Sequence, residues 1–529
     1  MSARAHTLGE VLGEKAARRG ESEALVTDRV RLDYAKLAEA AWRTAKAMYA
    51  LGIGRGDQVG VLMGNGAPWL AVFYGAALIG AVTVPVNTRF KAAELAFCLK
   101  RADCRAVFLD GRFLGIDFAA MLREVRGELP RLEHAIVVGE QVAAVELAWD
   151  AFHALGSRTS EAEARTAADA VRPDDALLIQ FTSGTTAYPK GVVLTHDGML
   201  RNAHAAGMRM GVAADDRYFN CRPFFHVGGS TLSALVALVS GACLVTLPTF
   251  EPGAALAMME SERCTLTSGN DTIFQMLMGH ASFAQRRLRL RGGWAAAGPR
   301  TLRNIIDKLG AKHICAAYGL SEASPNVAMS DWRDPEALRV AGLAMPLPGV
   351  ELRIADPAGG APLARDAQGE IQVRGWNVMR GYYNDPEASA KAITADGWLR
   401  TGDLGTLSID GRLRMVGRLK DVFRVGGENV APAEVEEVLL AHPAVATAQV
   451  VGVPDARLGE VPCAYVTLRS NARASEQELI AWARARCASF RVPRYLKIVA
   501  DFESIGMTAS GKVQKARLRE HAVRELRLA

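Results

Sequence analysis

The chain has 529 residues, of which 50% are hydrophobic and 23% charged, with a formal net charge of +6. This length exceeds what one compact core supports, so we expect two or more domains. The modest charge, without a block of Lys and Arg or interleaved basic and aromatic residues, argues against a nucleic-acid partner. Eight scattered cysteines without metal-ligand or C-x-x-C spacing favour a reducing cytosol. The charged segment Met1–Gly20 has no apolar signal core, so we expect a cytoplasmic protein.

Two long runs without charged residues raise the question of a membrane span. Val59–Thr88 and Pro223–Phe250 are each long enough to cross a bilayer, but Gly, Pro and Asn interrupt both. Each run divides into a helix followed by a strand, which is typical of an α/β core and predicts no integral membrane contact. The expected pairs are Trp69–Ile79 with Ala81–Val86, and Thr231–Val239 with Cys243–Leu247.

Helix and strand signals alternate through the first 330 residues and predict α/β subdomains. Tyr34–Leu51 is an Ala-rich helix, and the polar segment Gly156–Ala170 is a surface helix or a linker. The expected strands before residue 170 are Gln58–Met63, Val82–Val86, Ala106–Leu109 and His134–Val138.

A glycine- and hydroxyl-rich segment, Phe181–Gly191, lies between two apolar runs. Ala176–Gln180 before it and Val192–Thr195 after it both have the composition of buried strands, so the segment is a turn that joins two strands. A Walker-type loop would instead lead into a helix and end in Gly-Lys-Ser/Thr. Backbone N–H groups, hydroxyls and Lys190 would together make a cradle for a polyphosphate. The alternative is an ordinary polar hairpin loop.

The pattern changes after residue 330. Gly342–Arg353, Gly369–Arg374 and Gly411–Val416 are short strands with Gly and Pro turns, which predict a small β-barrel. From Lys420 onward a helix, two strands and a second helix predict a compact α+β unit. Their expected bounds are Val430–Leu440, Ala446–Val453, Cys463–Leu468 and Glu476–Ala488, and the domain boundaries are 1–419 and 420–529.

The turn resembles a known signature. Its sequence Thr-Ser-Gly-Thr-Thr-x-x-Pro-Lys-Gly is similar to the phosphate loop of the adenylate-forming superfamily, which comprises acyl- and aryl-CoA synthetases, peptide-synthetase adenylation domains and luciferases. Ala187 departs from the glycine that is usual there. The resemblance implies a large N-terminal domain of α/β subdomains with a small β-barrel, and a small mobile α+β C-terminal domain. It also implies that the loop holds the ATP phosphates through Thr182, Ser183, Gly184, Thr185, Thr186 and Lys190.

The segment Tyr318-Gly319-Leu320-Ser321-Glu322 resembles a second motif of the same superfamily. By itself it would be only a helix cap. The resemblance implies that Tyr318 and Gly319 border the adenine and that Ser321 reaches a phosphate. It also makes Glu322 both a catalytic residue and the ligand for Mg²⁺, which prefers few protein oxygens beside phosphate oxygens.

Phe224-Phe225-His226-Val227-Gly228-Gly229 lies between an expected strand and an apolar helix. A lone histidine is more often a core residue than a site residue. In the superfamily, an aromatic-His pair here borders the acyl group, which implies that His226 orients the reacting carboxylate. Gly228 and Gly229 would then leave a wall without side chains for a sizeable acyl group.

Four further matches follow in order along the chain. Asp403, in a Thr-Gly-Asp turn, can accept hydrogen bonds from both ribose hydroxyls. The resemblance implies that Arg418 contacts the nucleotide and that Lys420 is the hinge between domains. It further implies that Gly426 and Gly427 line the tunnel for the pantetheine arm of CoA, and that Lys512 is the catalytic lysine, acting on the α-phosphate of ATP.

These motifs, taken together, predict an ATP-dependent carboxylic acid–CoA ligase that forms an acyl-adenylate and then a thioester. Its substrates would be ATP, CoA and a medium- or long-chain fatty acid, with Mg²⁺ as cofactor. An aryl or alicyclic acid, a carrier-protein thiol in place of CoA, a luciferase-like oxygenase and a non-catalytic homologue are the alternatives. The sequence does not decide whether the protein forms a homodimer.

Overall fold

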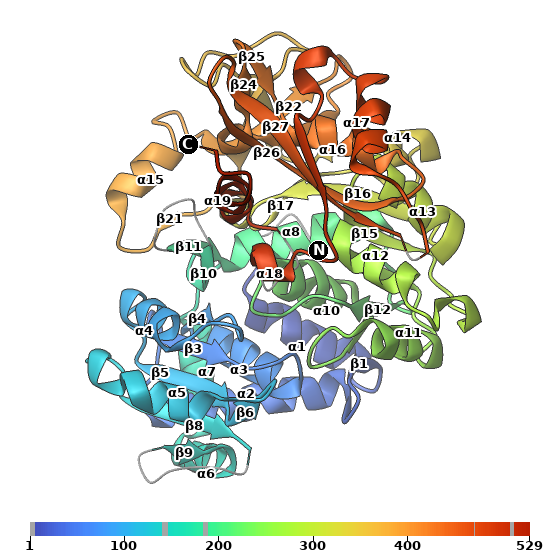
Figure 1. Cartoon of the computed structure of the whole chain (residues 1–529). Helices are drawn as coiled ribbons and strands as arrows, with labels where there is room; N and C mark the ends of the chain where they lie inside the picture. Colours follow the sequence, from blue (N-terminus) through green and yellow to red (C-terminus); the bar gives the residue numbers. More distant parts are fainter. Residues whose placement is uncertain (1–5, 140–145, 183–188, 470, 508–512, 529) are drawn as a thin grey trace.

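The computed structural model describes residues 6–139, 146–182, 189–469, 471–507 and 513–528. Figure 1 shows the N-terminal two thirds of the chain as helices and sheets in the lower and middle parts of the view, with the C-terminal unit in orange and red above them. Within the described ranges, no helix has the length and apolarity needed to cross a bilayer.

An eight-stranded sheet contains all the strands expected before residue 200. Its spatial order is β21 (Gly381–Tyr382), β11 (Lys190–Thr195), β10 (Ala176–Thr182), β4 (Val82–Pro85), β3 (Gln58–Leu62), β5 (Ala106–Asp110), β8 (His134–Val138) and β9 (Leu147–Ala148). Side chains alternate between two faces, so Phe108 joins one apolar cluster and Val107 another. The helices that cover the faces are α2 (Tyr34–Ala50) and α3 (Ala67–Leu78) on one side, and α4 (Ala92–Arg101) and α5 (Phe118–Val125) on the other.

The turn at Phe181–Gly191 joins two strands, as the sequence predicts. β10 and β11 are antiparallel, and Thr182 pairs with Lys190 at the end of the ladder. The polar segment before them is a short 3-10 turn, Gly156–Arg158, followed by α7 (Glu161–Asp169), whose N-cap Ser160 forms a capping box with Glu163.

A nine-stranded sheet forms the second α/β layer. Its order is β18 (Met345–Pro346), β17 (Asn326–Met329), β16 (His313–Gly319), β15 (Gly292–Ala296), β14 (Leu266–Asn270), β12 (Arg217–Asn220), β13 (Cys243–Thr246), β1 (Glu23–Val26) and β2 (Arg31–Asp33). One face packs on α8 (His196–Met210) and on the helical segment α9–η3–α10 (Val227–Ser240), and the other on α11 (Pro252–Ser261), α12 (Asp271–Gly279) and α13 (Pro299–Leu309). Both uncharged runs are therefore helix and strand in the core.

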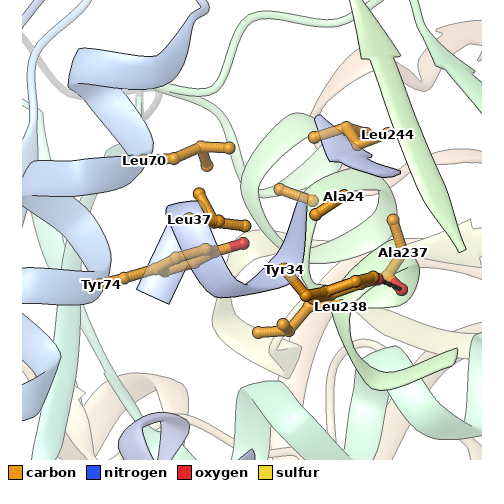
Figure 2. Close-up of a pocket in the computed structure, with 9 residues that line it drawn as sticks. Ala24, Tyr34, Leu37, Leu70, Tyr74, Ala237, Leu238 and Leu244 are labelled. Carbon is orange, nitrogen blue, oxygen red and sulfur yellow. Dashed lines mark hydrogen bonds between the residues drawn. The ribbon is translucent and has the colours of Figure 1, made fainter. Parts of the chain in front are cut away.

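The two sheets share one core, which α2, α3 and α10 fill between them. Figure 2 shows a small apolar gap in this core, lined by Leu37, Leu70 and Tyr74, among others. The hydroxyl of Tyr34 donates to Ala242 O at 2.7 Å, so the polar group at its edge is satisfied. The gap has a volume of about 10 Å³. An apolar gap of this size is a packing defect rather than a ligand site.

Residues 350–418 form a four-stranded antiparallel sheet in the order β19 (Val350–Ala355), β20 (Gly369–Gly375), β22 (Leu399–Leu407) and β23 (Leu413–Arg418). The sequence predicts a small β-barrel here. Among the described residues β19 and β23 do not pair with each other, so the strands form an open sheet with two edges. One edge strand, β23, leads directly into the segment that contains Lys420.

The C-terminal unit has its own sheet and its own apolar clusters. The strands are β25 (Glu428–Val430), β24 (Phe423–Val425), β27 (Gly459–Leu468) and β26 (Val445–Asp455), with β28 (Tyr495–Ile498) parallel to β27. The helices are α16 (Pro432–Leu440), α17 (Glu476–Arg484), α18 (Glu503–Gly506) and α19 (Lys515–Glu525). Arg300 on α13 donates to His442 O at 3.4 Å, which joins this unit to the nine-stranded sheet region. The α+β organisation matches the prediction from Lys420 onward.

Candidate active site

The expected site residues lie where strands end. Thr182 ends β10 and Gly319 ends β16, while His226 follows β12 after a short turn. In α/β sheets, ligands bind outside the carboxyl ends of the strands, because loops from several strands converge there. The sheet topology therefore brings together motifs that lie more than a hundred residues apart in the chain.

Asp403 is the centre of one cluster. Its residue is 2% exposed, and its Oδ2 accepts a hydrogen bond from the hydroxyl of Tyr318 at 2.9 Å. Arg418 lies opposite Asp403 in the β22–β23 ladder, and its Nε is 3.1 Å from Oδ1 of Asp403. Burial, and then the neighbouring carboxylate, raise the pKa of Tyr318 well above its usual value, so the phenol remains a donor. Three residues that the sequence assigns to the nucleotide are thus in direct contact.

Tyr382, which no sequence motif indicated, connects Glu322 with Lys190. The hydroxyl of Tyr382 donates to Oε1 of Glu322 at 3.1 Å, and Nζ of Lys190 lies 4.9 Å from the centre of the Tyr382 ring. Tyr382 reaches this position because β21 pairs with β11, Tyr382 opposite Val192. A strand of two residues leaves no periodic signal, so nothing in the sequence pattern marks it.

The Glu322 carboxylate fits the magnesium role that the resemblance implies. Glu322 lies in a single 3-10 turn, Ser321–Ala323, directly after β16, and Ser321 is in the same turn. One oxygen accepts from Tyr382, and a carboxylate has further acceptor sites for a cation. Among the described residues no cluster of three or more His, Cys, Asp or Glu side chains could hold a metal ion. A magnesium ion at Glu322 would therefore share phosphate oxygens, as Mg²⁺ prefers.

His226 caps the helical turn Val227–Gly229, and its Nδ1 accepts a hydrogen bond from the N–H of Gly228 at 3.0 Å. In a neutral imidazole with Nδ1 as acceptor, Nε2 carries the proton and is the donor. His226 is half-buried. This tautomer suits a residue that donates to a carboxylate oxygen.

The glycines after His226 correct the expectation of a wall without side chains. A Cβ at Gly229 would lie 2.3 Å from Pro223 O, and a Cβ at Gly228 would lie 2.6 Å from Nε of Arg222. The space beside both glycines is therefore occupied by the preceding turn of the chain itself. Their missing side chains admit Arg222 and Pro223 rather than an acyl group.

The other glycines of the predicted site have backbone reasons to be glycine. A Cβ at Gly319 would lie 2.2 Å from Pro325 O. Gly426 and Gly427 have φ of 58° and 99° and form the two-residue turn between β24 and β25, where positive φ favours glycine. Lys420 is exposed in the turn Leu419–Asp421, and partial desolvation by the surrounding chain lowers the pKa of its ammonium.

Five predicted site residues lie outside the described part of the chain. They are Ser183, Gly184, Thr185 and Thr186 of the phosphate loop, and Lys512. The described residues that flank the phosphate-loop segment are Thr182 and Pro189. Those that flank the Lys512 segment are Met507 and Val513, which form a β-bridge with each other.

Comparison with known proteins identifies the family. The chain belongs to the AMP-binding enzymes: the family model "AMP-binding enzyme" matches residues 12–383 and the model "AMP-binding enzyme C-terminal domain" matches residues 434–512. The chain is 39% identical over 501 residues to a methyl-dioxo-octahydro-indenyl-propanoyl:CoA ligase of Mycobacterium tuberculosis, covering 94% of this chain and 95% of the relative. It is 32% identical over 546 residues to the mitochondrial medium-chain acyl-CoA ligase ACSF2 of Rattus norvegicus, covering 99% and 88%.

Solved structures of adenylate-forming enzymes have the same fold as this chain. ATP-bound MatB from Rhodopseudomonas palustris superimposes with a TM-score of 0.84 at 26% identity, covering 98% of this chain and 99% of that one. The anthranilate CoA ligase AuaEII, in complex with anthranoyl-AMP, has the same fold, with a TM-score of 0.89 at 24% identity over 99% and 98% of the two chains. The protein is thus an acyl-CoA synthetase, an AMP-forming acid–thiol ligase that works through an acyl-adenylate. The luciferase-like and non-catalytic alternatives are set aside by this assignment.

Proposed function

We propose that this acyl-CoA synthetase activates a medium-sized aliphatic or alicyclic carboxylic acid. The observation that carries this proposal is the Arg222–Trp294 pair, whose guanidinium carbon lies 5.5 Å from the centre of the indole ring. Trp294 pairs with Cys315 on β16, three residues before Tyr318, which corresponds to about 10 Å along a strand. A large side-chain pair at that depth limits how far an acyl chain can extend. A medium-sized acid is therefore favoured over a long one.

The relatives support the same size class. The name of one specifies a medium-chain acyl group, and the name of the other a bicyclic dioxo group on a propanoyl chain. Neither name describes an aryl acid. The proposal keeps the aliphatic acid expected from the sequence, admits the alicyclic alternative and excludes the longest chains.

The residue roles in this proposal follow the contacts described above. Attack of the acid on the α-phosphorus of ATP displaces pyrophosphate, and negative charge develops on the phosphate oxygens. Preplaced donors and cations that meet this charge lower the barrier. Lys190 would hold the β- and γ-phosphates, and Lys512 would bind the α-phosphate. A magnesium ion at Glu322 would supply further positive charge to the phosphates.

The remaining groups position the two substrates. The carboxylate of Asp403 would accept from the ribose hydroxyls in place of its present donors, and Nε2–H of His226 would donate to the acid carboxylate. In the second half-reaction, the CoA thiol attacks the acyl carbonyl and AMP leaves. We propose that rotation at Lys420 moves Lys512 away and admits CoA beside Gly426 and Gly427, since domain motion can gate such a step.

Acid-dependent ATP–pyrophosphate exchange tests the first half-reaction. A panel of hexanoic, octanoic, palmitic, cyclohexanecarboxylic and benzoic acids should give the largest kcat/KM for octanoic or cyclohexanecarboxylic acid. A maximum for palmitic or benzoic acid would contradict the size class. Thioester formation with CoA, compared with formation on a phosphopantetheinyl carrier protein, should favour CoA.

A further inference from the structure

Two buried amide side chains of one sheet hold the chain segment that leads into His226. This segment follows β12 and belongs to the nine-stranded sheet. Gln180 lies on β10 of the eight-stranded sheet, and Asn65 follows β3 of the same sheet. Gln180 is 5% exposed and Asn65 is 8% exposed. Both side chains therefore reach from one sheet to the backbone of the other.

Gln180 contacts the residue directly before His226. Its Nε2 donates to O of Phe225 at 3.1 Å and to O of Phe181 at 3.2 Å. Side chains alternate along β10, so Gln180 lies on the same face as Leu178, which packs in the core that the two sheets share. One amide group thus ties the carbonyl before His226 to the strand that leads to the phosphate loop.

Asn65 holds the same segment closer to its start. Its Oδ1 accepts from the N–H of Phe224 at 2.7 Å, and its Nδ2 donates to O of Arg222 at 2.9 Å. The N–H of Asn65 donates to O of Pro248 at 3.0 Å, so its own backbone is anchored as well. Gln180 and Asn65 together leave little freedom in the four residues before His226.

His226 itself is bonded on its other side. Its N–H donates to O of Pro223 at 3.1 Å, and its carbonyl accepts from the N–H of Gly229 at 2.8 Å. The N–H of Gly228 donates to Nδ1 of the imidazole. The ring therefore has a fixed place relative to β10, and the bond from Gln180 to Phe225 is part of what fixes it.

Stability does not explain a glutamine at position 180. Its Oε1 is buried and has no hydrogen-bond partner among the described residues. Burial of a polar atom without a partner is costly, and an unbranched methionine would fill a similar volume without that cost. The hydrogen bond to O of Phe225 gives the amide a purpose that methionine lacks.

We propose that Gln180 is a positioning residue for the adenylation step and that it acts through His226. Its amide holds the carbonyl of Phe225 so that Nε2–H of His226 points at the carboxylate of the acid. Displacing a positioned group by about 1 Å can slow a reaction about a hundredfold, so one hydrogen bond to the adjacent backbone can matter. This inference rests on the role of His226 in the proposed function.

The test replaces Gln180 by methionine and measures pyrophosphate exchange with octanoic acid. The value of kcat/KM for the acid should fall about tenfold or more. The KM for ATP should stay unchanged, because the β10–β11 ladder holds Thr182 opposite Lys190 without this side chain. The melting temperature should change little, since the variant loses a donor and an unpartnered acceptor together. Gln180→Glu keeps the shape but replaces the donor by an acceptor, and it should show the same kinetic change.

A double-mutant cycle with His226→Ala separates positioning from a general structural role. If Gln180 acts through His226, then Gln180→Met should have little further effect on kcat/KM once the imidazole is absent. Equal effects of Gln180→Met in the wild-type and His226→Ala backgrounds would overturn the inference. An unchanged kcat/KM for the acid in Gln180→Met alone would overturn it too.

Tyr34→Phe is the matched control. It also removes a buried donor to backbone carbonyls, because the hydroxyl of Tyr34 donates to O of Ala242 at 2.7 Å and to O of Ala237 at 3.2 Å. These contacts lie in the core beside the gap in Figure 2. The variant should lower the melting temperature and leave kcat/KM for the acid unchanged.

The acid panel distinguishes failure of this inference from failure of the proposed function. A maximum for palmitic or benzoic acid would contradict the proposed size class, and the same variants would then be compared with that acid. A wild-type kcat/KM in His226→Ala would remove His226 from the proposed function and would refute the positioning role with it. A large effect of His226→Ala beside an inert Gln180→Met would refute the positioning role alone.

Discussion

The hydroxyl of Tyr382 donates a hydrogen bond to Oε1 of Glu322 at 3.1 Å. The same tyrosine places its ring under Nζ of Lys190, so one side chain connects the end of the phosphate loop with the carboxylate expected to hold magnesium. Burial and the neighbouring carboxylate raise the pKa of Tyr382, which keeps the phenol protonated and donating. The hydrogen bond fixes the orientation of the Glu322 carboxylate.

Replacing Tyr382 by phenylalanine removes this hydrogen bond and keeps the ring. A hydrogen bond to a charged group contributes about 1.5–3 kcal/mol, so Tyr382→Phe should lower kcat/KM for pyrophosphate exchange about tenfold or more and raise the Mg²⁺ concentration needed for half-maximal rate. Tyr383→Phe is the control, because the hydroxyl of Tyr383 contacts Asp103 at 3.4 Å instead. Equal Mg²⁺ dependence in the two variants would show that Tyr382 does not position the metal ligand.

Asp403→Asn should weaken nucleotide binding. The substitution removes the charge that Arg418 pairs with and one acceptor for the Tyr318 hydroxyl. We expect the dissociation constant for ATP, measured by calorimetry, to rise about tenfold to a hundredfold. Asp410→Asn, on the exposed turn where Asp410 pairs with Arg412, should leave it unchanged. An unchanged ATP affinity in Asp403→Asn would remove Asp403 from the ribose site.

Lys512→Ala should separate the two half-reactions. The variant should lose acid-dependent pyrophosphate exchange, because the α-phosphate loses its cation, but it should still form the thioester from supplied acyl-AMP and CoA. Single-turnover assays of each half measure this. Lys391→Ala, which changes an exposed lysine paired with Glu387, should affect neither half. Equal loss of both halves in Lys512→Ala would contradict the assignment of the lysine to the first step.

Stability should decline in mild acid because of His196. This histidine is fully buried, its Nδ1 accepts from the N–H of Leu8 at 3.1 Å, and burial lowers its pKa from 6.5 to about 4. The unfolded chain binds a proton between these values that the folded protein excludes. The stability that His196 contributes is therefore complete above pH 6.5 and is lost as pH falls toward 4, by up to about 3 kcal/mol.

His196→Asn should keep an acceptor for Leu8 and remove the titration. Unfolding followed from pH 7 to pH 4 should give a shallower loss of stability for the variant than for the wild type. His153, whose pKa burial also lowers to about 4, should preserve part of the slope in both proteins. Parallel curves for the two proteins would rule out His196 as the source.

The fold follows from local patterns where the elements are long or bounded clearly. His134–Val138 matches β8 in both bounds, and β10 and β11 flank the phosphate loop, because apolar strands between polar turns give an unambiguous signal. The open sheet at residues 350–418 differs from the predicted barrel, since closure depends on how edge strands meet and short strands do not encode that.

The site residues also divide into those that sequence motifs predict and those that only the pairing of strands brings into the site. Tyr318, Asp403 and Arg418 could be grouped through their motifs, and their contacts match that grouping. Tyr382 could not be predicted, because it reaches Glu322 only through the pairing of β21 with β11. Arg222, which stacks on Trp294, could not be predicted either, since a single arginine before an aromatic-His motif has no periodic signature.

The pairing of Asp403 with Tyr318 and Arg418 affects the end of the reaction as well as its start. In the proposed ribose site, a ribose hydroxyl that takes the place of Tyr318 or Arg418 on this carboxylate gains only the difference between two similar interactions. When AMP leaves this proposed site, Tyr318 and Arg418 would return to Asp403 and keep its buried charge paired. Such an exchange of donors would keep the enzyme, which releases AMP in every cycle, from binding this product too tightly.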